Sequence, residues 1–251
     1  SNFARDMTLS MGAHHGRLYF LSRDCAKEGT GHGSPMPQLV HGGPGRAGGG
    51  EELGGIRSVL HYMQRTAIQG HPNTLTAITE QYQKGSDRNE GLVHPFRKNF
   101  EELQIGDSLT THKRTVTETD IVNFAGISGD NFYAHTDITS LGEGSIFEGR
   151  VAHGYFVLSK AAGLFVDAKK GPVLLNYGLD ECRFTKPVYP GATIGVRFTC
   201  KEKINQEKKS EDDVAKGIVK FLVDVYDETG DTVALATILT MVKKRNQTDE
   251  L

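Results

Sequence analysis

The sequence has little excess charge, few cysteines and no long apolar run, and each shortage argues against a class of protein. Its 251 residues carry 29 Lys and Arg against 31 Asp and Glu, a formal net charge of -2. Nucleic-acid-binding domains usually present a basic face, so this near-balance favours no such partner. No apolar run approaches the ~20 residues that cross a bilayer, and no signal peptide is recognisable. We therefore expect a soluble, cytoplasmic protein without a membrane partner.

The cysteines and the chain ends add two expectations. Cys25, Cys182 and Cys200 are an odd number without CxxC spacing, which is typical of reduced thiols rather than disulfides or a zinc site. The chain begins at Ser1 without an initiator Met, so we expect a fragment or a shortened chain. Its last four residues lack the Lys of an endoplasmic-reticulum retention signal.

The composition changes near residue 90. Glycines crowd residues 42–55, where a regular helix or central strand is disfavoured. Apolar residues at helical spacing predict a helix over 56–67, and a second short helix is expected over 73–83. The small polar residues 85–91 are typical of a linker. The expected organisation is an N-terminal part over 1–84, a linker over 85–95, a compact domain over 96–244 and a tail over 245–251.

The compact domain reads as an α+β unit. Thr117 and Asp120 have capping-box spacing ahead of an apolar helix. The stretch 155–168 has two charged residues, which predicts a helix buried on most sides. Period-2 alternation predicts antiparallel strands at 194–201, 219–225 and 233–242, with the charged stretch 201–216 as a hairpin loop. Together these patterns predict a sheet wrapped around one helix.

Two short segments carry candidate chemistry. Asp130 and His135 lie five residues apart on a loop that begins at Gly129, and an Asp/His pair can both activate water and return a proton. Alone, such a pair is more often a turn aspartate beside a surface histidine. Gly154 immediately precedes the predicted buried helix, so its N–H lies at the helix N-terminus, where it can stabilise an oxyanion. The side chain of His153 is expected to be a packed histidine.

The order of these elements resembles the MaoC-like dehydratase family, also called (R)-specific enoyl-CoA hydratases. The matching segments are Phe100–Asp107, Gly129–His135, Val151–Gly154 and Phe184–Gly191. The resemblance implies a hotdog fold that forms a homodimer or a higher homo-oligomer and takes an acyl-CoA substrate. It also implies Asp130 and His135 as the acid/base pair and Gly154 N–H as the donor to the thioester carbonyl, with no cofactor or metal.

A finer resemblance concerns the loop and the N-terminal part. Phe132 and Tyr133 stand where the family commonly has Asn-Pro. This aromatic version is similar to the hydratase half of bifunctional phenylacetate-degradation proteins, in which an aldehyde dehydrogenase precedes a domain that opens oxepin-CoA by hydration. Residues 37–55 resemble the end of that dehydrogenase, so residues 1–84 are expected to be its C-terminal remnant. A general (R)-specific hydratase and a non-catalytic assembly module remain the alternatives.

Other signals were weighed against these. Residues 43–48 match the dinucleotide fingerprint, but a proline occupies the turn and no helix follows, so a structural glycine loop is expected. The histidines His14, His15 and His41 lack the spacing that would complete a metal site. Cys25 is expected to be an ordinary cysteine, because the resemblance places the dehydrogenase nucleophile upstream. The lysines that could meet coenzyme A phosphates are left unassigned: Lys203, Lys208 and Lys209.

Overall fold

The computed structural model describes residues 2–11, 14–15, 18, 56, 59, 69–142 and 144–245. The chain divides into two compact units, residues 1–68 and 69–251. The first unit contains α1 (Asn2–Met11). The glycine-rich run and nearly all of the helix predicted over 56–67 lie outside the described residues. The division after residue 68 does not coincide with the boundary expected at residue 84.

The second unit is built on a seven-stranded sheet. Its path runs β1-β2-β5-β6-β7-β4, and β3 pairs separately with β5. The β1–β2 pair is parallel and the other pairs are antiparallel. The strands are β1 (Asn89–Glu90), β2 (Asp107–Thr110), β3 (Arg114–Thr115), β4 (Val173–Phe184), β5 (Thr193–Asn205), β6 (Lys216–Tyr226) and β7 (Thr232–Lys243). The helices are α3 (Pro72–Thr79), η3 (Pro95–Arg97), α4 (Glu118–Ser128), α5 (Tyr133–Thr136), η4 (Ile138–Ser140) and α6 (Gly154–Phe165).

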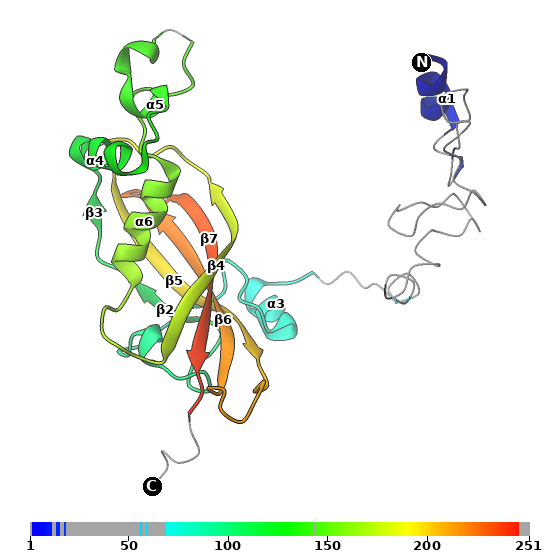
Figure 1. Ribbon diagram of the computed structural model, residues 1–251, viewed down its shortest axis with the longest axis vertical. Helices are drawn as coiled ribbons and strands as arrows, with labels where there is room; N and C mark the ends of the chain where they lie inside the picture. The colour runs from blue at the N-terminus through cyan, green and yellow to red at the C-terminus, as the bar shows by residue number, and fades with distance from the viewer. Residues whose placement is uncertain are drawn as a thin grey trace. The chain divides into compact units, whose positions relative to one another are not determined.

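The predicted alternation of the long strands is confirmed. The inward residues of β5 and β6 are almost completely buried: Ile194, Val196, Phe198, Cys200, Val219, Phe221, Val223 and Val225. The Phe198 ring stacks on Phe165 of α6 and on Phe221, with centroids 4.5 Å apart in each pair. Helix α6 therefore lies along this face of the sheet (Figure 1), and the apolar core forms between them.

Helix α6 is shorter than predicted. It ends at Phe165 rather than at residue 168, and Asp167 beyond it pairs with Arg97. Its exposed residues Tyr155, Ser159 and Gly163 are spaced four apart and form a single stripe, and the other residues of the helix are buried or half-buried. Most sides of the helix are therefore covered, as predicted. Its buried residues are Phe156, Val157, Ala161, Leu164 and Phe165.

Residues 69–95 are part of the second unit. The Tyr82 N–H donates to the carbonyl of Lys201, 2.8 Å away, and β1 extends the sheet beside β2. Tyr82 lines a hollow of about 220 Å³ together with Arg197 and Leu222, which point away from α6 by the alternation of their strands. The segment expected as a linker, 85–95, therefore contains β1 and the first residue of η3. Helix α3 stops at Thr79, earlier than predicted, where Glu80 takes a left-handed conformation with φ 53°.

The remaining differences concern strands. β4 was not predicted, and its register with β7 shifts at three places, one of them beside Glu181 with φ 53°. Strand β5 continues to Asn205, so the hairpin loop covers 206–215 rather than 201–216. Within the described residues, no helix is both long and apolar enough to cross a membrane.

Candidate active site

The candidate site begins where α4 ends. The predicted capping box is present: Thr117 Oγ1 accepts from the Asp120 N–H at 3.1 Å, and Asp120 Oδ2 accepts from the Thr117 N–H at 2.9 Å. Asp120 also pairs with Lys160 of α6 at 3.2 Å, which ties the two helices together. Helix α4 stops at Gly129, whose φ of 75° favours glycine. Asp130 therefore leaves the helix at a defined position.

Asp130 and His135 are held on a short turn. The Phe132 N–H donates to Asp130 Oδ1 at 3.2 Å, and His135 follows on the single-turn helix α5. The Nδ1 of His135 lies 2.7 Å from the carbonyl of Val151. Because a carbonyl can only accept, this Nδ1 carries the hydrogen, and Nε2 of the neutral ring is left as an acceptor. The Asp130 side chain is exposed and His135 is half-buried.

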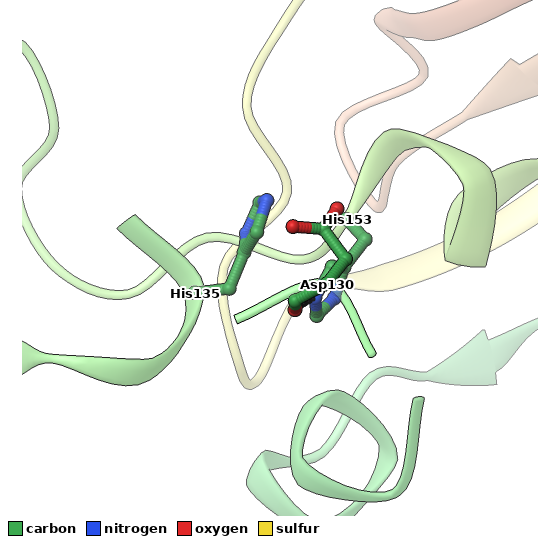
Figure 2. A group of neighbouring side chains, drawn as sticks. All are labelled: Asp130, His135 and His153. Atoms are coloured by element: carbon green, nitrogen blue, oxygen red, sulfur yellow. Dashed lines mark hydrogen bonds between the residues drawn. The ribbon is translucent and has the colours of Figure 1, made fainter. Parts of the chain in front are cut away.

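A third side chain joins the pair. His153 is 1% exposed, its Nε2 lies 2.9 Å from the carbonyl of Asp130, and its ring stacks on His135 at 3.8 Å. One ligand-capable atom from each of Asp130, His135 and His153 lies within 4.8 Å of the others (Figure 2). The ring planes of the two histidines differ by 28°.

Gly154 brings a backbone donor to the same place. It is the first residue of α6, and His153 at the N-cap makes no side-chain cap. In the described part of the chain, no acceptor is recorded for the Gly154 N–H. A Cβ on Gly154 would lie 2.5 Å from the Phe184 ring, so glycine is also required by the close approach of that ring.

A pocket of about 320 Å³ lies in front of these groups. It is lined by His135 and Gly154 together with Phe147, Val157, Phe184 and Val188. The first residue of α6 and the imidazole of His135 thus line one mostly apolar hollow. Such a hollow can take an uncharged chain or ring beside a polar group that needs hydrogen-bond donors.

The structure brings together the three residues singled out from the sequence, Asp130, His135 and Gly154; their catalytic roles stay predictions. Sequence reasoning missed the contact of His153 with both acid/base residues, as well as Phe147 and Phe184 in the pocket wall. Phe184 stands in one of the matched segments, which was a usable signal. Phe147 and the His153 contacts had no local signal, because they depend on long-range approach.

The described part of the chain offers little support for the rival candidates. Among the described residues, His14 and His15 belong to no group with metal-ligand spacing. Residues 43–48, His41 and Cys25 lie outside the described residues. Lys203 Nζ donates to the carbonyl of Leu103, and Lys208 Nζ donates to the carbonyl of Glu211. Cys182 and Cys200 are both free thiols, and burial raises the pKa of Cys200 to about 12.

Comparison with known proteins identifies the family of the compact domain. Residues 100–220 match the family model described as a MaoC like domain. A solved structure described as a monoamine oxidase regulatory protein from Archaeoglobus fulgidus shares 31% identity and a TM-score of 0.54, covering 60% of this chain and 97% of its own. A MaoC-like dehydratase from Rhodospirillum rubrum shares 25% identity and a TM-score of 0.50, covering 59% and 99%. The chain therefore contains a MaoC-like dehydratase domain with the hotdog fold.

Longer similarity comes from curated relatives. The chain is 59% identical over 212 residues to Protein MaoC of Klebsiella aerogenes, covering 84% of this chain and 63% of that protein. It is 33% identical over 92 residues to Nodulation protein N of Rhizobium leguminosarum bv. viciae, covering 35% of this chain and 57% of that protein. The chain thus spans less than two thirds of these relatives. An alignment over 84% of the chain must extend into the segment before Gln69, so the similarity to the Klebsiella protein is not confined to the hotdog unit.

Proposed function

We propose that the hotdog unit is an acyl-CoA hydratase, which adds water across a double bond conjugated with a thioester. The observation that carries the proposal is the pocket that His135 and Gly154 line together, with Asp130 beside His135. A base and an oxyanion donor at one apolar hollow are the two groups that such an addition needs. The MaoC-like match over residues 100–220 supports a hydratase or dehydratase rather than another use of the fold.

The proposed step uses three groups of this chain. A water between Asp130 and His135 gives a proton to Nε2 of His135, which is the free acceptor because Nδ1 is bonded to Val151. The water oxygen bonds to the β-carbon, and the electron pair of the double bond moves toward the thioester oxygen. The Gly154 N–H donates to that oxygen as it becomes an enolate. The α-carbon then takes the proton back from His135, so one water is added and no redox cofactor is required.

For the substrate we propose oxepin-CoA. The aromatic pair Phe132 and Tyr133 between Asp130 and His135 supports this, as do Phe147 and Phe184, which line the pocket and can pack against a compact unsaturated ring. Hydration of the ring yields a hemiacetal that opens to an aldehyde. We further propose that residues 1–84 are the C-terminal remnant of an aldehyde dehydrogenase that oxidises this aldehyde. The similarity to the Klebsiella protein before Gln69 supports a shared N-terminal part.

We also propose that the unit assembles as a homodimer or a higher homo-oligomer. Hotdog-fold neighbours support this, among them a Mycobacterium tuberculosis protein described as a double hotdog fold, with 14% identity and a TM-score of 0.53. This chain covers 47% of that double-hotdog chain. Sedimentation of the full chain measures the number of subunits.

The test follows hydration of crotonyl-CoA and of oxepin-CoA by loss of the conjugated thioester absorbance. The variants are Asp130→Asn and, as the matched control, Asp137→Asn on the same loop, which caps η4 and lies outside the cluster. We expect Asp130→Asn to lower kcat by at least about 10²-fold and Asp137→Asn to change it little. Turnover of oxepin-CoA with much weaker crotonyl-CoA hydration supports ring opening.

Two other outcomes decide against parts of the proposal. Crotonyl-CoA turnover alone favours a general (R)-specific hydratase. An Asp130→Asn variant as active as the parent on both substrates removes the catalytic assignment. If the parent protein assembles but turns over neither substrate, the result favours a non-catalytic assembly module.

A further inference from the structure

His153 is a buried histidine at the N-terminus of α6, and its ring nitrogens do not cap the helix. It occupies the N-cap of α6 but caps nothing with its side chain. Its Nε2 faces the carbonyl of Asp130 at 2.9 Å, and because that carbonyl can only accept, Nε2 carries the hydrogen. Its ring lies between His135, stacked at 3.8 Å, and Phe124 of α4, tilted at 5.0 Å. The residue therefore touches both members of the proposed acid/base pair.

The other ring nitrogen makes this contact more informative. Nδ1 of His153 is buried and has no hydrogen-bond partner among the described residues. A buried acceptor without a partner costs free energy that an apolar side chain of similar size avoids. If this residue served packing alone, an apolar side chain would therefore give a more stable fold than histidine. The hydrogen bond to Asp130 and the flat ring under His135 are the two features that an apolar residue cannot supply together.

The segment Val151–Gly154 consequently reaches all three groups of the site. The carbonyl of Val151 orients the ring of His135, and the ring of His153 stacks against it. The Nε2–H of His153 donates to the carbonyl of Asp130 and so holds that loop. Gly154 supplies the backbone donor at the start of α6.

We propose that His153 is the positioning residue of this site, which fixes the Asp130 loop by its N–H and the plane of His135 by its ring. The proposal rests on the proposed hydratase function, in which a small misplacement of the base lowers the rate of the chemical step more than the binding of substrate. The titratable groups that face His153 in the described structure are Asp130 and His135, from the α4–α5 loop and α5.

Three substitutions in the full chain separate the two features. His153→Leu keeps the bulk and removes both, His153→Gln keeps an amide donor in reach of Asp130, and His153→Phe keeps a ring under His135. Ile121→Val, at a fully buried position of α4, is the control for a purely structural loss. We expect His153→Leu to lower kcat about 10²-fold with a small change in KM and a melting temperature near the parent's. His153→Gln and His153→Phe should each recover part of kcat.

A parental kcat in His153→Leu overturns the proposal. So does an equal fall of kcat in all three variants that follows their loss of stability, because that is the behaviour of a core residue, and Ile121→Val calibrates it. The ¹⁵N resonances of the imidazole rings provide a readout that needs no turnover. We expect the parent to show hydrogen on Nε2 of His153 and on Nδ1 of His135, and His153→Leu to show a mixture of tautomers at His135. If the parent hydrates no acyl-CoA, the proposed function fails, and an unchanged His135 tautomer in His153→Leu separately overturns the positioning role.

Discussion

The first residue of α6 permits a quantitative test of how the pocket wall is built. A Cβ on Gly154 would lie 2.5 Å from Cε2 and Cζ of the Phe184 ring, whereas a Cβ on Gly163 in the same helix would meet no heavy atom within 4 Å. Gly154→Ala and Gly163→Ala are therefore matched variants. Both add one methyl group to the same helix, but the added Cβ is crowded at residue 154 and unobstructed at residue 163.

The two changes should have opposite signs. Gly163→Ala removes a flexible residue from the helix interior and should stabilise the unit by about 0.5–1 kcal/mol. Gly154→Ala must move the Phe184 ring by roughly 1 Å to restore ordinary contact. Overpacking costs about 1–3 kcal/mol, and because the ring is 48% exposed and can move, we expect the lower end. The variants should differ by about 2 kcal/mol, or roughly 4–8 °C in Tm for a chain of this size.

Urea unfolding followed by far-ultraviolet circular dichroism measures the difference, with equal m-values required for the comparison. Phe184→Leu in the Gly154→Ala background removes the ring atoms that clash and should recover most of the loss relative to Phe184→Leu alone. If Gly154→Ala unfolds at the same urea concentration as Gly163→Ala, or a higher one, the Phe184 ring does not press on the start of α6.

Two further predictions concern titrating groups. Burial opposes the charge of Asp227, but hydrogen bonds from Lys186, Thr229 and the main chain hold its pKa at about 2. Because this pKa lies below the ordinary value of about 3.9, the stabilisation of the folded state is present above pH ~4 and is lost as the pH falls toward ~2. The urea midpoint of the parent should therefore fall more steeply over that interval than that of Asp227→Asn, and parallel curves would contradict the pairing. Because burial raises the pKa of Cys200 to about 12, a thiol reagent near pH ~8 should modify Cys182 in the folded protein and Cys200 after unfolding. A thiol that reacts rapidly in folded Cys25→Ser/Cys182→Ser would show that Cys200 is accessible.

The parts of the fold that were predictable are those with a strong local cause. The capping box at Thr117 and the glycine at 129 set the limits of α4, because backbone N–H groups at a helix start and a left-handed residue at its end have short-range solutions. The alternation in β5, β6 and β7 was equally readable, because one face of each strand is buried throughout.

Strand β4 shows why other parts were not predictable. Its burial pattern does not alternate, and its register with β7 shifts at three places. A bulge reverses which side chains face the core, so the period-2 signal cancels along the strand. The end of α6 escaped prediction for a similar reason: Val166 and Ala168 continue the apolar pattern, while the partner of Asp167, Arg97, is distant in sequence.

For the site, the sequence by itself determined which residue types occur and in what order: Asp130 and His135 after a capped helix, then His153 and Gly154 at the start of an apolar one. The hotdog architecture was predictable from that order through its resemblance to a known family. The tertiary structure alone decided that the carbonyl of Asp130 meets His153, that Val151 selects the tautomer of His135, and that Phe184 closes on Gly154. These contacts join residues 16 to 30 positions apart in sequence, and such distances are set by how helix and sheet pack rather than by any local preference of the chain.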